Sequence, residues 1–288
     1  MKKFAVIDIG SNSVRLMFVA DGKVLYKRLN TTRLGEGLAQ SSVLKKEAIA
    51  RSANAVAAFY GQAVEEGAEG VFAFATAAVR SAKNGGEFVT AVRERCGLVV
   101  DVIAGEIEAE IGILGALGKN DGAVIDVGGA STELVVKESG RLVYKKSVDI
   151  GVVRLKDTCG REKSSLVAAA TAAAKKYGKT PKLTCVHAIG GTATTLAAWK
   201  RGLTAYDPEK ITGTKISEAE MAAMAEDLLA KSVEEIAAFP CMPTGRADVL
   251  AGGAALLATL MRELGIEKLI VSDRDNLEGY AIKKGLME

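Results

Sequence analysis

The chain has 288 residues, of which 49% are hydrophobic and 25% are charged, and its net charge is +3 at pH 7. At about 100–200 residues per domain, this length predicts two domains with a sizeable core. Aromatic residues make up only 5% of the chain, and no basic stripe is interleaved with them. We therefore expect no nucleic-acid partner.

The cysteines and the apolar runs predict a cytoplasmic protein without a membrane partner. The four cysteines lie far apart and form no C-x-x-C pair, which is typical of reduced thiols. No apolar stretch approaches the ~20 residues that a membrane-spanning helix needs. The short apolar run before Asp8 is interpreted as a strand rather than a signal peptide. The single histidine, His187, excludes a metal site with several histidine ligands.

Strands alternate with helices along the chain, which is typical of an α/β fold. In the first half we expect strands at 4–9, 14–20, 23–28, 71–76 and 99–103, and helices at 45–66, 84–96 and 106–117. In the second half we expect strands at 123–127, 132–138, 141–147, 184–189 and 268–272, and helices at 164–177, 192–200, 217–231, 245–264 and 277–286. The turn at 118–122 divides the chain into expected domains at 1–120 and 121–288.

An internal repeat relates the two halves. Residues 5–28 (AVIDIGSNSVRLMFVADGKVLYKR) align without a gap with residues 123–146 (AVIDVGGASTELVVKESGRLVYKK). The identical pairs include Asp8/Asp126, Gly10/Gly128 and Ser13/Ser131. Each copy reads as strand, small-residue turn, strand, glycine turn and strand. We infer an ancient duplication whose two loops face each other across a cleft, because ligands of such sheets bind beyond the carboxyl ends of strands.

The first repeated loop, DIGSNS at 8–13, can hold a phosphate chain and a metal ion. Asp8 offers a carboxylate to Mg²⁺, which prefers oxygen ligands. Gly10 removes side-chain bulk, so that the backbone N–H groups of Ser11, Asn12 and Ser13 can approach phosphate oxygens. The alternative explanation is an ordinary β-turn built from favoured turn residues.

Two further small-residue loops strengthen the functional interpretation. The second copy of the repeat supplies the candidate ligands Asp126, Gly128, Gly129, Ala130, Ser131, Thr132 and Glu133. Glu133 stands where the first copy has Arg15, so the two loops are not equivalent. A third loop with Gly190, Gly191 and Thr192 ends a strand and begins a helix, whose N-terminus favours anions.

Glu108 is the candidate general base. It shares a helical stripe with Gly112 and Gly115, so its carboxylate can approach a substrate closely and deprotonate a water molecule. The alternative is a solvated helix start, where acidic residues are favoured by the helix dipole.

Other charged residues have structural explanations beside the functional ones. Arg80, just beyond the strand at 71–76, suits phosphate through its planar guanidinium, but a surface ion pair is the common alternative. Arg246 and Asp248 open a helix and can form a structural pair. His187 is interpreted as a packed histidine.

Six segments together resemble the exopolyphosphatase/guanosine pentaphosphate phosphatase (Ppx/GppA) family. They are IDIGSNSVRL at the start, ATAAVRSAKN at 75–84, GEIEAEIG at 105–112, IDVGGASTEL at 125–134, GGTATTLAA at 190–198 and GRADVLAGGA at 245–254. They span almost the whole chain, in the family's order and at its usual spacing. The resemblance implies duplicated domains of the actin, Hsp70 and sugar-kinase (ribonuclease H-like) type with a cleft between them. The final helix is expected to pack back on the first domain.

The resemblance also implies an activity and its residues. The activity is release of a terminal phosphate from inorganic polyphosphate, or from guanosine pentaphosphate, by in-line attack of water with Mg²⁺ or Mn²⁺. The matching positions are Glu108 for the general base, Asp8, Asp126 and Glu133 for the metal, and Asn12, Ser131 and Arg80 for phosphate. Family members are often dimers, which leaves a homodimer open as an assembly.

Departures from the family pattern and rival functions limit these expectations. Longer members append helical domains, including an HD-type domain, whereas this sequence ends at residue 288 with one histidine. We therefore expect that domain to be absent, which puts high processivity in doubt. Ala130 stands where glycine is common, a change that still admits phosphate.

Two alternative functions remain open: a small-molecule kinase that uses Gly190 and Gly191 for adenosine, and a sensor of polyphosphate or alarmone. Glu108 argues mildly against the sensor, because a pure binder needs no general base.

Overall fold

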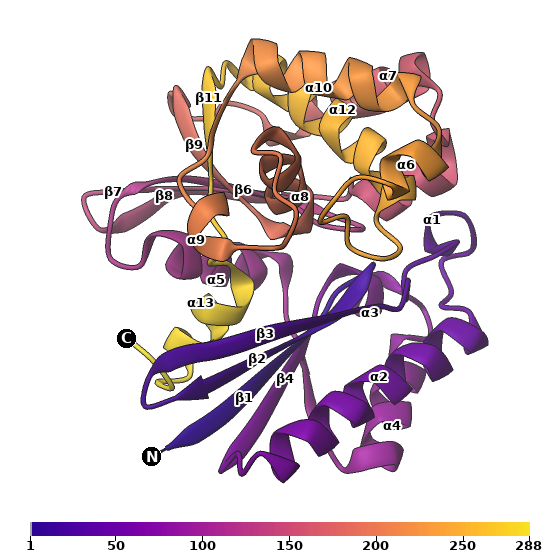
Figure 1. The fold of residues 1–288 in the computed structure, drawn as a ribbon, viewed down its shortest axis with the longest axis vertical. Coiled ribbons are helices and arrows are strands. Elements are labelled where there is room, and N and C mark those ends of the chain that lie inside the picture. Colours follow the sequence, from indigo (N-terminus) through magenta and orange to yellow (C-terminus); the bar gives the residue numbers. More distant parts are fainter. Residues whose placement is uncertain (1) are drawn as a thin grey trace.

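Two β-sheets and the helices that cover them build the molecule (Figure 1). The computed structural model describes residues 2–288. The first sheet has the order β3-β2-β1-β4-β5, with β1 (Lys3–Ile9), β2 (Ser13–Ala20), β3 (Lys23–Thr31), β4 (Gly70–Ala75) and β5 (Val100–Val102). The second has the order β10-β11-β9-β6-β7-β8, with β6 (Gly122–Val127), β7 (Thr132–Glu138), β8 (Arg141–Val148), β9 (Cys185–Ile189), β10 (Lys215–Ser217) and β11 (Lys268–Val271). The expected α/β class is confirmed.

The sequence repeat is a structural repeat. In each sheet three antiparallel strands, β1-β2-β3 or β6-β7-β8, are joined to a parallel neighbour, β4 or β9. The register shifts at the same point of both copies, between Phe18 and Val19 and between Val136 and Lys137. The hairpin turns Asp21-Gly22 and Ser139-Gly140 have positive φ at every residue, as a two-residue type I′ turn requires. The duplicated actin-like plan is therefore present in both halves.

The longer helices cover the outer sides of the sheets. Helices α2 (Lys46–Glu65) and α4 (Gly85–Cys96) lie on one face of the first sheet (Figure 1). Helices α7 (Lys163–Tyr177), α8 (Gly190–Lys200), α10 (Glu218–Ala230) and α12 (Ala247–Leu264) gather beyond the second sheet (Figure 1). The short elements that the sequence did not reveal are α1 (Leu38–Ser41), α3 (Ala77–Ser81), α6 (Val152–Cys159), α9 (Pro208–Ile211), α11 (Val233–Ala237) and β10.

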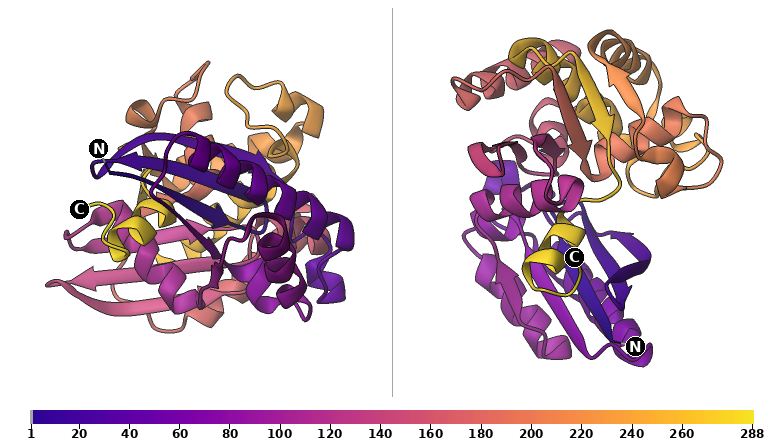
Figure 2. Two further views of the ribbon diagram at one scale, coloured as in Figure 1. Left: turned by 90° about the horizontal axis from the view of Figure 1, so that it is seen from below. Right: turned by 90° about the vertical axis from the view of Figure 1, so that its left-hand side faces the viewer.

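Helices α5 (Gly105–Leu117) and α13 (Asn276–Lys283) pack against each other between the two sheets (Figures 1 and 2). On one side of α5, Ile111 packs with Phe74 of the first sheet and Tyr280 of α13. On its other side, Ile113 packs with Val135 of the second sheet. We propose a domain division at residue 120, with α5 and α13 forming an interior layer that both halves share.

Glycines let α5 and α13 approach closely. A Cβ atom on Gly115 would overlap the carbonyl oxygen of Asp275, and one on Gly279 would overlap the carbonyl oxygen of Ile111. Gly112 faces the side chain of Asn276 in the same way. The glycines that follow Glu108 in the helical stripe therefore make room for α13 rather than for a substrate.

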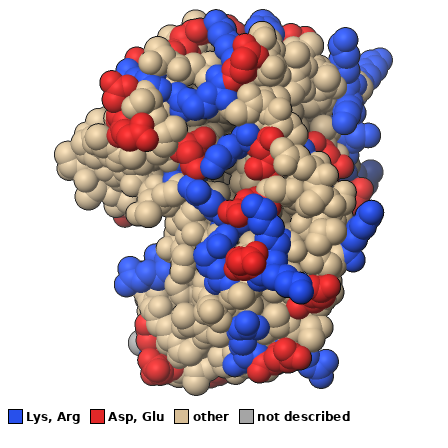
Figure 3. Space-filling view, turned by 90° about the vertical axis from the view of Figure 1, so that its right-hand side faces the viewer, with Lys and Arg blue, Asp and Glu red and all other residues tan. Residues whose placement is uncertain are grey.

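The surface charge shown in Figure 3 and the cysteines do not point to a particular function. On the face in Figure 3, basic and acidic side chains are interspersed. All four cysteines are free. Within residues 2–288, no helix combines the length and the apolar character that crossing a membrane requires.

Candidate active site

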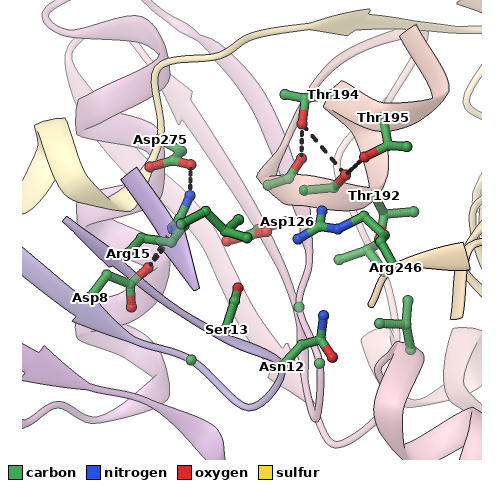
Figure 4. A pocket seen from close by; sticks show the side chains of 18 of the residues that line it. Asp8, Asn12, Ser13, Arg15, Asp126, Thr192, Thr194, Thr195, Arg246 and Asp275 are labelled. Carbon is green, nitrogen blue, oxygen red and sulfur yellow. Dashed lines mark hydrogen bonds and ion pairs between the residues drawn. The ribbon is translucent and has the colours of Figure 1, made fainter. Parts of the chain in front are cut away.

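A cavity of about 580 Å³ lies where the three small-residue loops meet. It is lined by most of the residues that the sequence singled out, namely Asp8, Gly10, Ser11, Asn12, Ser13, Glu108, Asp126, Gly128, Gly129, Ala130, Ser131, Gly190, Gly191 and Thr192. Arg80, Thr132 and Glu133 do not line it. In Figure 4, Asp8, Asn12 and Ser13 from the first half converge with Asp126 from the second. The loops of the two repeats thus enclose one common space.

The two repeated loops adopt the same turn and touch each other. In each, the N–H of the loop glycine donates to the carbonyl of the serine three positions on. These pairs are Gly10–Ser13 and Gly128–Ser131, both at 3.0 Å. A Cβ atom on Gly129 would lie only 2.7 Å from the Cβ of Ser11. Glycine at this position therefore allows the loops to meet.

The third loop places the start of α8 at the cavity. Gly190, with φ of 80°, is the first residue of the helix, and a Cβ atom there would overlap the carboxylate of Asp126. The hydroxyl of Thr195 donates back to the carbonyl of Gly191 at 2.7 Å. The first N–H groups of an α-helix have no partner within the helix. They offer donors to an anion in the cavity.

The buried carboxyl groups that belong to the site or adjoin it include Asp8, Glu108, Asp126, Glu133 and Asp275. Burial raises the pKa of Glu108 to about 7 and that of Asp126 to about 6, and the charges of neighbouring acids add to both shifts. Burial also raises the pKa of Glu133 well above its usual range, again with help from neighbouring acids. Burial raises the pKa of Asp8 as well, although the charge of Arg15 opposes this. Such a group of acids attracts cations and holds protons in their absence.

Glu108 is held by Arg80. The Nη1 atom of Arg80 donates to Glu108 Oε2 at 2.9 Å and to the carbonyl of Ile103 at 2.8 Å. Arg80 lies just beyond β4, in the short helix α3. Its guanidinium therefore orients the Glu108 carboxylate and does not face the open cavity.

Asp8 is held by Arg15, its neighbour on the adjacent strand β2. The guanidinium of Arg15 donates to Asp8 Oδ2 and to Asp275 Oδ2 (Figure 4). In the second copy, the same register places Glu133 beside Asp126. Because Arg15 in the first copy is replaced by Glu133 in the second, Asp8 is ion-paired whereas Asp126 lies beside another acid.

The residues of this site fit a divalent cation with oxygen ligands. Asp8 and Asp126 line the cavity, and the buried Oε2 atom of Glu133 has no hydrogen-bond partner. Within residues 2–288, no three His, Cys, Asp or Glu side chains group closely enough to hold a metal by themselves. Substrate oxygens or water would have to complete the coordination, which is how Mg²⁺ usually binds beside one or two carboxylates.

Arg246 is a buried cation in the cavity that the sequence did not single out as a ligand. It is 7% exposed, its Nε atom has no partner, and it forms no ion pair among the described residues. The expected pair with Asp248 is wrong, because Asp248 binds Arg33 at 2.7 Å and Lys156 at 2.5 Å. Burial lowers the pKa of Arg246 to about 10, and the charge of Arg15 adds to this. An anion is the partner that this guanidinium lacks.

The rest of the lining combines charged side chains, among them Lys27, Arg28 and Asp273, with apolar and aromatic ones. It includes Leu29, Tyr206, Cys241, Met242 and Pro243. Leu29 and Tyr206 are 42% and 49% exposed, so this part of the cavity faces solvent. The hydroxyl of Tyr206 donates to Asp273, which leaves its ring free to contact a ligand.

Comparison with known proteins identifies the family of the chain. The model of the Ppx/GppA phosphatase family matches residues 16–286. Exopolyphosphatase 2 of Mycobacterium tuberculosis is 32% identical over 98% of this chain and 98% of its own length. A guanosine-5'-triphosphate,3'-diphosphate pyrophosphatase of Vibrio cholerae is 29% identical over 99% of this chain, which spans only 58% of that protein.

Solved structures agree with the sequence relatives. The crystal structure of the Aquifex aeolicus member of the Ppx/GppA family is 30% identical, with a TM-score of 0.78 over 99% of this chain and 98% of that one. An exopolyphosphatase-like protein is 26% identical, with a TM-score of 0.89 over 98% of both chains. With a family match over most of its length, the chain belongs to the Ppx/GppA phosphatase family.

Proposed function

We propose that this chain is a phosphoanhydride hydrolase that releases the terminal phosphate of inorganic polyphosphate. The observation that carries the proposal is the cavity between the repeat loops, which is lined by the start of α8, by Arg246 and by the buried Glu108. The full-length relative named exopolyphosphatase 2 supports polyphosphate as the substrate. The free cysteines support a reducing compartment, the cytoplasm.

The substrate phosphates would be held by backbone donors and by one guanidinium. The loop N–H groups around Gly10 and Gly128 and the first turn of α8 surround the cavity, and Arg246 adds a full positive charge. Asn12 and Ser131 contribute short side chains. Arg80 would act through Glu108, because its guanidinium already binds that carboxylate.

Glu108 would take the proton from the attacking water. A carboxyl group with a pKa of about 7 is suited to accept a proton near neutral pH. The water oxygen bonds to the terminal phosphorus as the bridging P–O bond breaks in line with it, and the leaving oxygen keeps the electron pair. The loop donors and Arg246 stabilise the charge on the transferring group.

A divalent cation, Mg²⁺ or Mn²⁺, would be held by Asp8 and Asp126, with Glu133 as a third candidate ligand. When bound, it neutralises phosphate charge and polarises the phosphoryl group. It would also offset the repulsion among the buried carboxylates and between them and the anionic substrate.

One assay tests the proposal. Phosphate release is measured side by side from long polyphosphate, short polyphosphate and guanosine pentaphosphate, with Mg²⁺ and with a chelator. We expect Mg²⁺-dependent release from polyphosphate. ATP-dependent phosphorylation of a metabolite without polyphosphate hydrolysis would favour the kinase alternative, and tight binding without turnover would favour a sensor.

A second candidate function is hydrolysis of guanosine pentaphosphate. The solvent-facing part of the cavity, with Leu29, Tyr206, Met242 and Pro243, offers apolar and aromatic contacts that a nucleoside can use and a phosphate chain cannot. A kcat/KM for guanosine pentaphosphate well above that for polyphosphate in the same assay would select this candidate.

A further inference from the structure

Two consecutive residues at the start of α13 reach the equivalent aspartates of both repeats. The Nδ2 atom of Asn276 donates to Asp126 Oδ2 at 2.8 Å. Asp275 accepts from Arg15, and the same guanidinium donates to Asp8 (Figure 4). Asp8, Asp126, Asp275 and Asn276 are all buried. A single helical turn thus contacts one aspartate directly and the other through one arginine.

The start of α13 is fixed independently of these contacts. Asp275 and Glu278 form a capping box, with Asp275 Oδ1 accepting from Leu277 N–H and Glu278 Oε2 accepting from Asp275 N–H, both at 3.0 Å. Lys27 of β3 binds Glu278 at 2.7 Å and Asp273 at 3.0 Å. The turn that carries Asp275 and Asn276 is therefore a rigid support and not a flexible end.

The two aspartates have little other support. Within residues 2–288, Asn276 is the one side chain that donates a hydrogen bond to Asp126, and Arg15 is the one that donates to Asp8. The same turn also packs against α5, the helix that carries Glu108, through the contacts of Gly112 and Gly115. The proposed metal ligands Asp8 and Asp126, and the helix that carries the proposed base Glu108, are therefore all positioned by contacts with the same turn.

We infer that Asp275 and Asn276 are positioning residues, which set the orientation and separation of Asp8 and Asp126 for a divalent cation. This inference rests on the proposed function. Asn276 fixes which oxygen of Asp126 is left for the cation. Asp275 draws the charge of Arg15 partly away from Asp8, whose carboxylate can then bind a cation as well. Partners of this kind behind metal-binding carboxylates commonly affect metal affinity by about 10- to 100-fold.

The test measures Mn²⁺ binding to the full chain without substrate, by calorimetry and by the electron paramagnetic resonance of free Mn²⁺. Asn276→Leu has a similar volume and removes the donor, and Asn276→Ser is a smaller change with the same expectation. Asp275→Asn keeps the helix cap and removes the charge beside Arg15. Arg274→Ala, at the exposed neighbouring position, is the matched control.

We expect Mn²⁺ affinity to fall by about tenfold or more in the Asn276 and Asp275 variants and to stay unchanged in Arg274→Ala. The Mg²⁺ concentration for half-maximal phosphate release should rise in parallel, while kcat recovers at saturating Mg²⁺. A general loss of structure would not recover in this way. Thermal unfolding in chelator checks that each variant is folded.

Two results would overturn the inference. One is an Mn²⁺ affinity within twofold of the wild type in folded Asn276 and Asp275 variants. The other is a wild type that binds Mn²⁺ no better than Asp8→Asn and Asp126→Asn. Weakened Mn²⁺ binding in a protein that releases no phosphate supports the inference and refutes the proposed function. Polyphosphate hydrolysis together with unchanged Mn²⁺ binding in the variants supports the proposed function and refutes the inference.

Discussion

At the scale of single residues, Arg246 is a guanidinium buried in the cavity wall, and it has no acidic partner among residues 2–288. Its neighbour Gly191 leaves it space, since a Cβ atom there would overlap the guanidinium. A buried charge without a partner destabilises the folded protein. An anion bound in the cavity would offset this destabilisation. The proposed substrate is a chain of such anions.

Replacing Arg246 with methionine should weaken substrate binding while leaving the fold intact. The loss of charge-assisted hydrogen bonds, each about 1.5–3 kcal/mol, is expected to raise KM for polyphosphate by about 10- to 100-fold. The midpoint of thermal unfolding without substrate should not fall, because an unpaired buried charge is removed. Arg262→Met, at an exposed position of α12, the helix whose N-cap is Arg246, is the control. An unchanged KM in Arg246→Met would contradict this role.

The raised pKa of Glu108 predicts how stability depends on pH. Burial raises this pKa from 4.5 to about 7, so the folded protein binds a proton that the unfolded chain has released between these values. Glu108 should therefore lower the free energy of unfolding without metal by at most ~3 kcal/mol as pH rises from about 4.5 to 7, in addition to the decrease that the other buried acids cause. Urea unfolding in chelator at pH 5 and pH 8 measures this for the wild type and for Glu108→Gln.

The glutamine variant should show a smaller decrease, because glutamine has no proton to lose. Mg²⁺ should reduce the decrease in the wild type, since a cation stabilises the ionised carboxylates. The same decrease in both proteins would show that Glu108 titrates normally.

The sequence identified the loop residues but not the partners that hold them. The ungapped repeat pointed to Asp8 and Asp126 directly, because matched polar residues at strand ends need no tertiary information. Arg246 and Asn276 could not be found in this way. Their roles depend on contacts with segments far away in the chain, and neither lies in the repeat.

At the scale of elements, the length of each segment decided what could be predicted. Strands such as β1 and β6 and long helices such as α2 and α12 carry enough residues for their periodicity to show. The helices of four or five residues, among them α3 with Arg80, do not. The sequence therefore placed Arg80 only as a residue just beyond the strand at 71–76, and its pairing with Glu108 could not be foreseen. The glycines of α5 were assigned to a substrate because α13, which contacts them, follows about 160 residues later in the chain.

A methyl group added at Gly115 should separate α5 from α13. A Cβ atom there overlaps the backbone of Asp275, and overpacking of this kind costs about 1–3 kcal/mol. Gly115→Ala is expected to lower the free energy of unfolding by that amount, as measured in urea. Gly61→Ala in α2, where a Cβ atom meets nothing within 4 Å, is the matched control and should be neutral or stabilising. Equal stability of the two variants would refute the close crossing.

At the scale of the whole molecule, the cavity lies between two sets of contacts that join the halves. One is the α5–α13 layer between the sheets. The other joins the segment after β3 to the second half, through Arg33 with Asp248 and through Gly37 N–H with Asp157 at 2.7 Å. The repeat predicted that two loops would face each other, and the joining contacts explain how they are held there.

We propose that a terminal phosphoanhydride is hydrolysed in this cavity with Glu108 as the base. The most direct measurement is the initial rate of phosphate release from polyphosphate in Mg²⁺ by the wild type, by Glu108→Gln and by Glu106→Gln, an exposed position of the same helix. We expect kcat of Glu108→Gln to fall by about 10²- to 10⁴-fold with KM little changed, and Glu106→Gln to match the wild type. Release at the wild-type rate by Glu108→Gln would contradict the account.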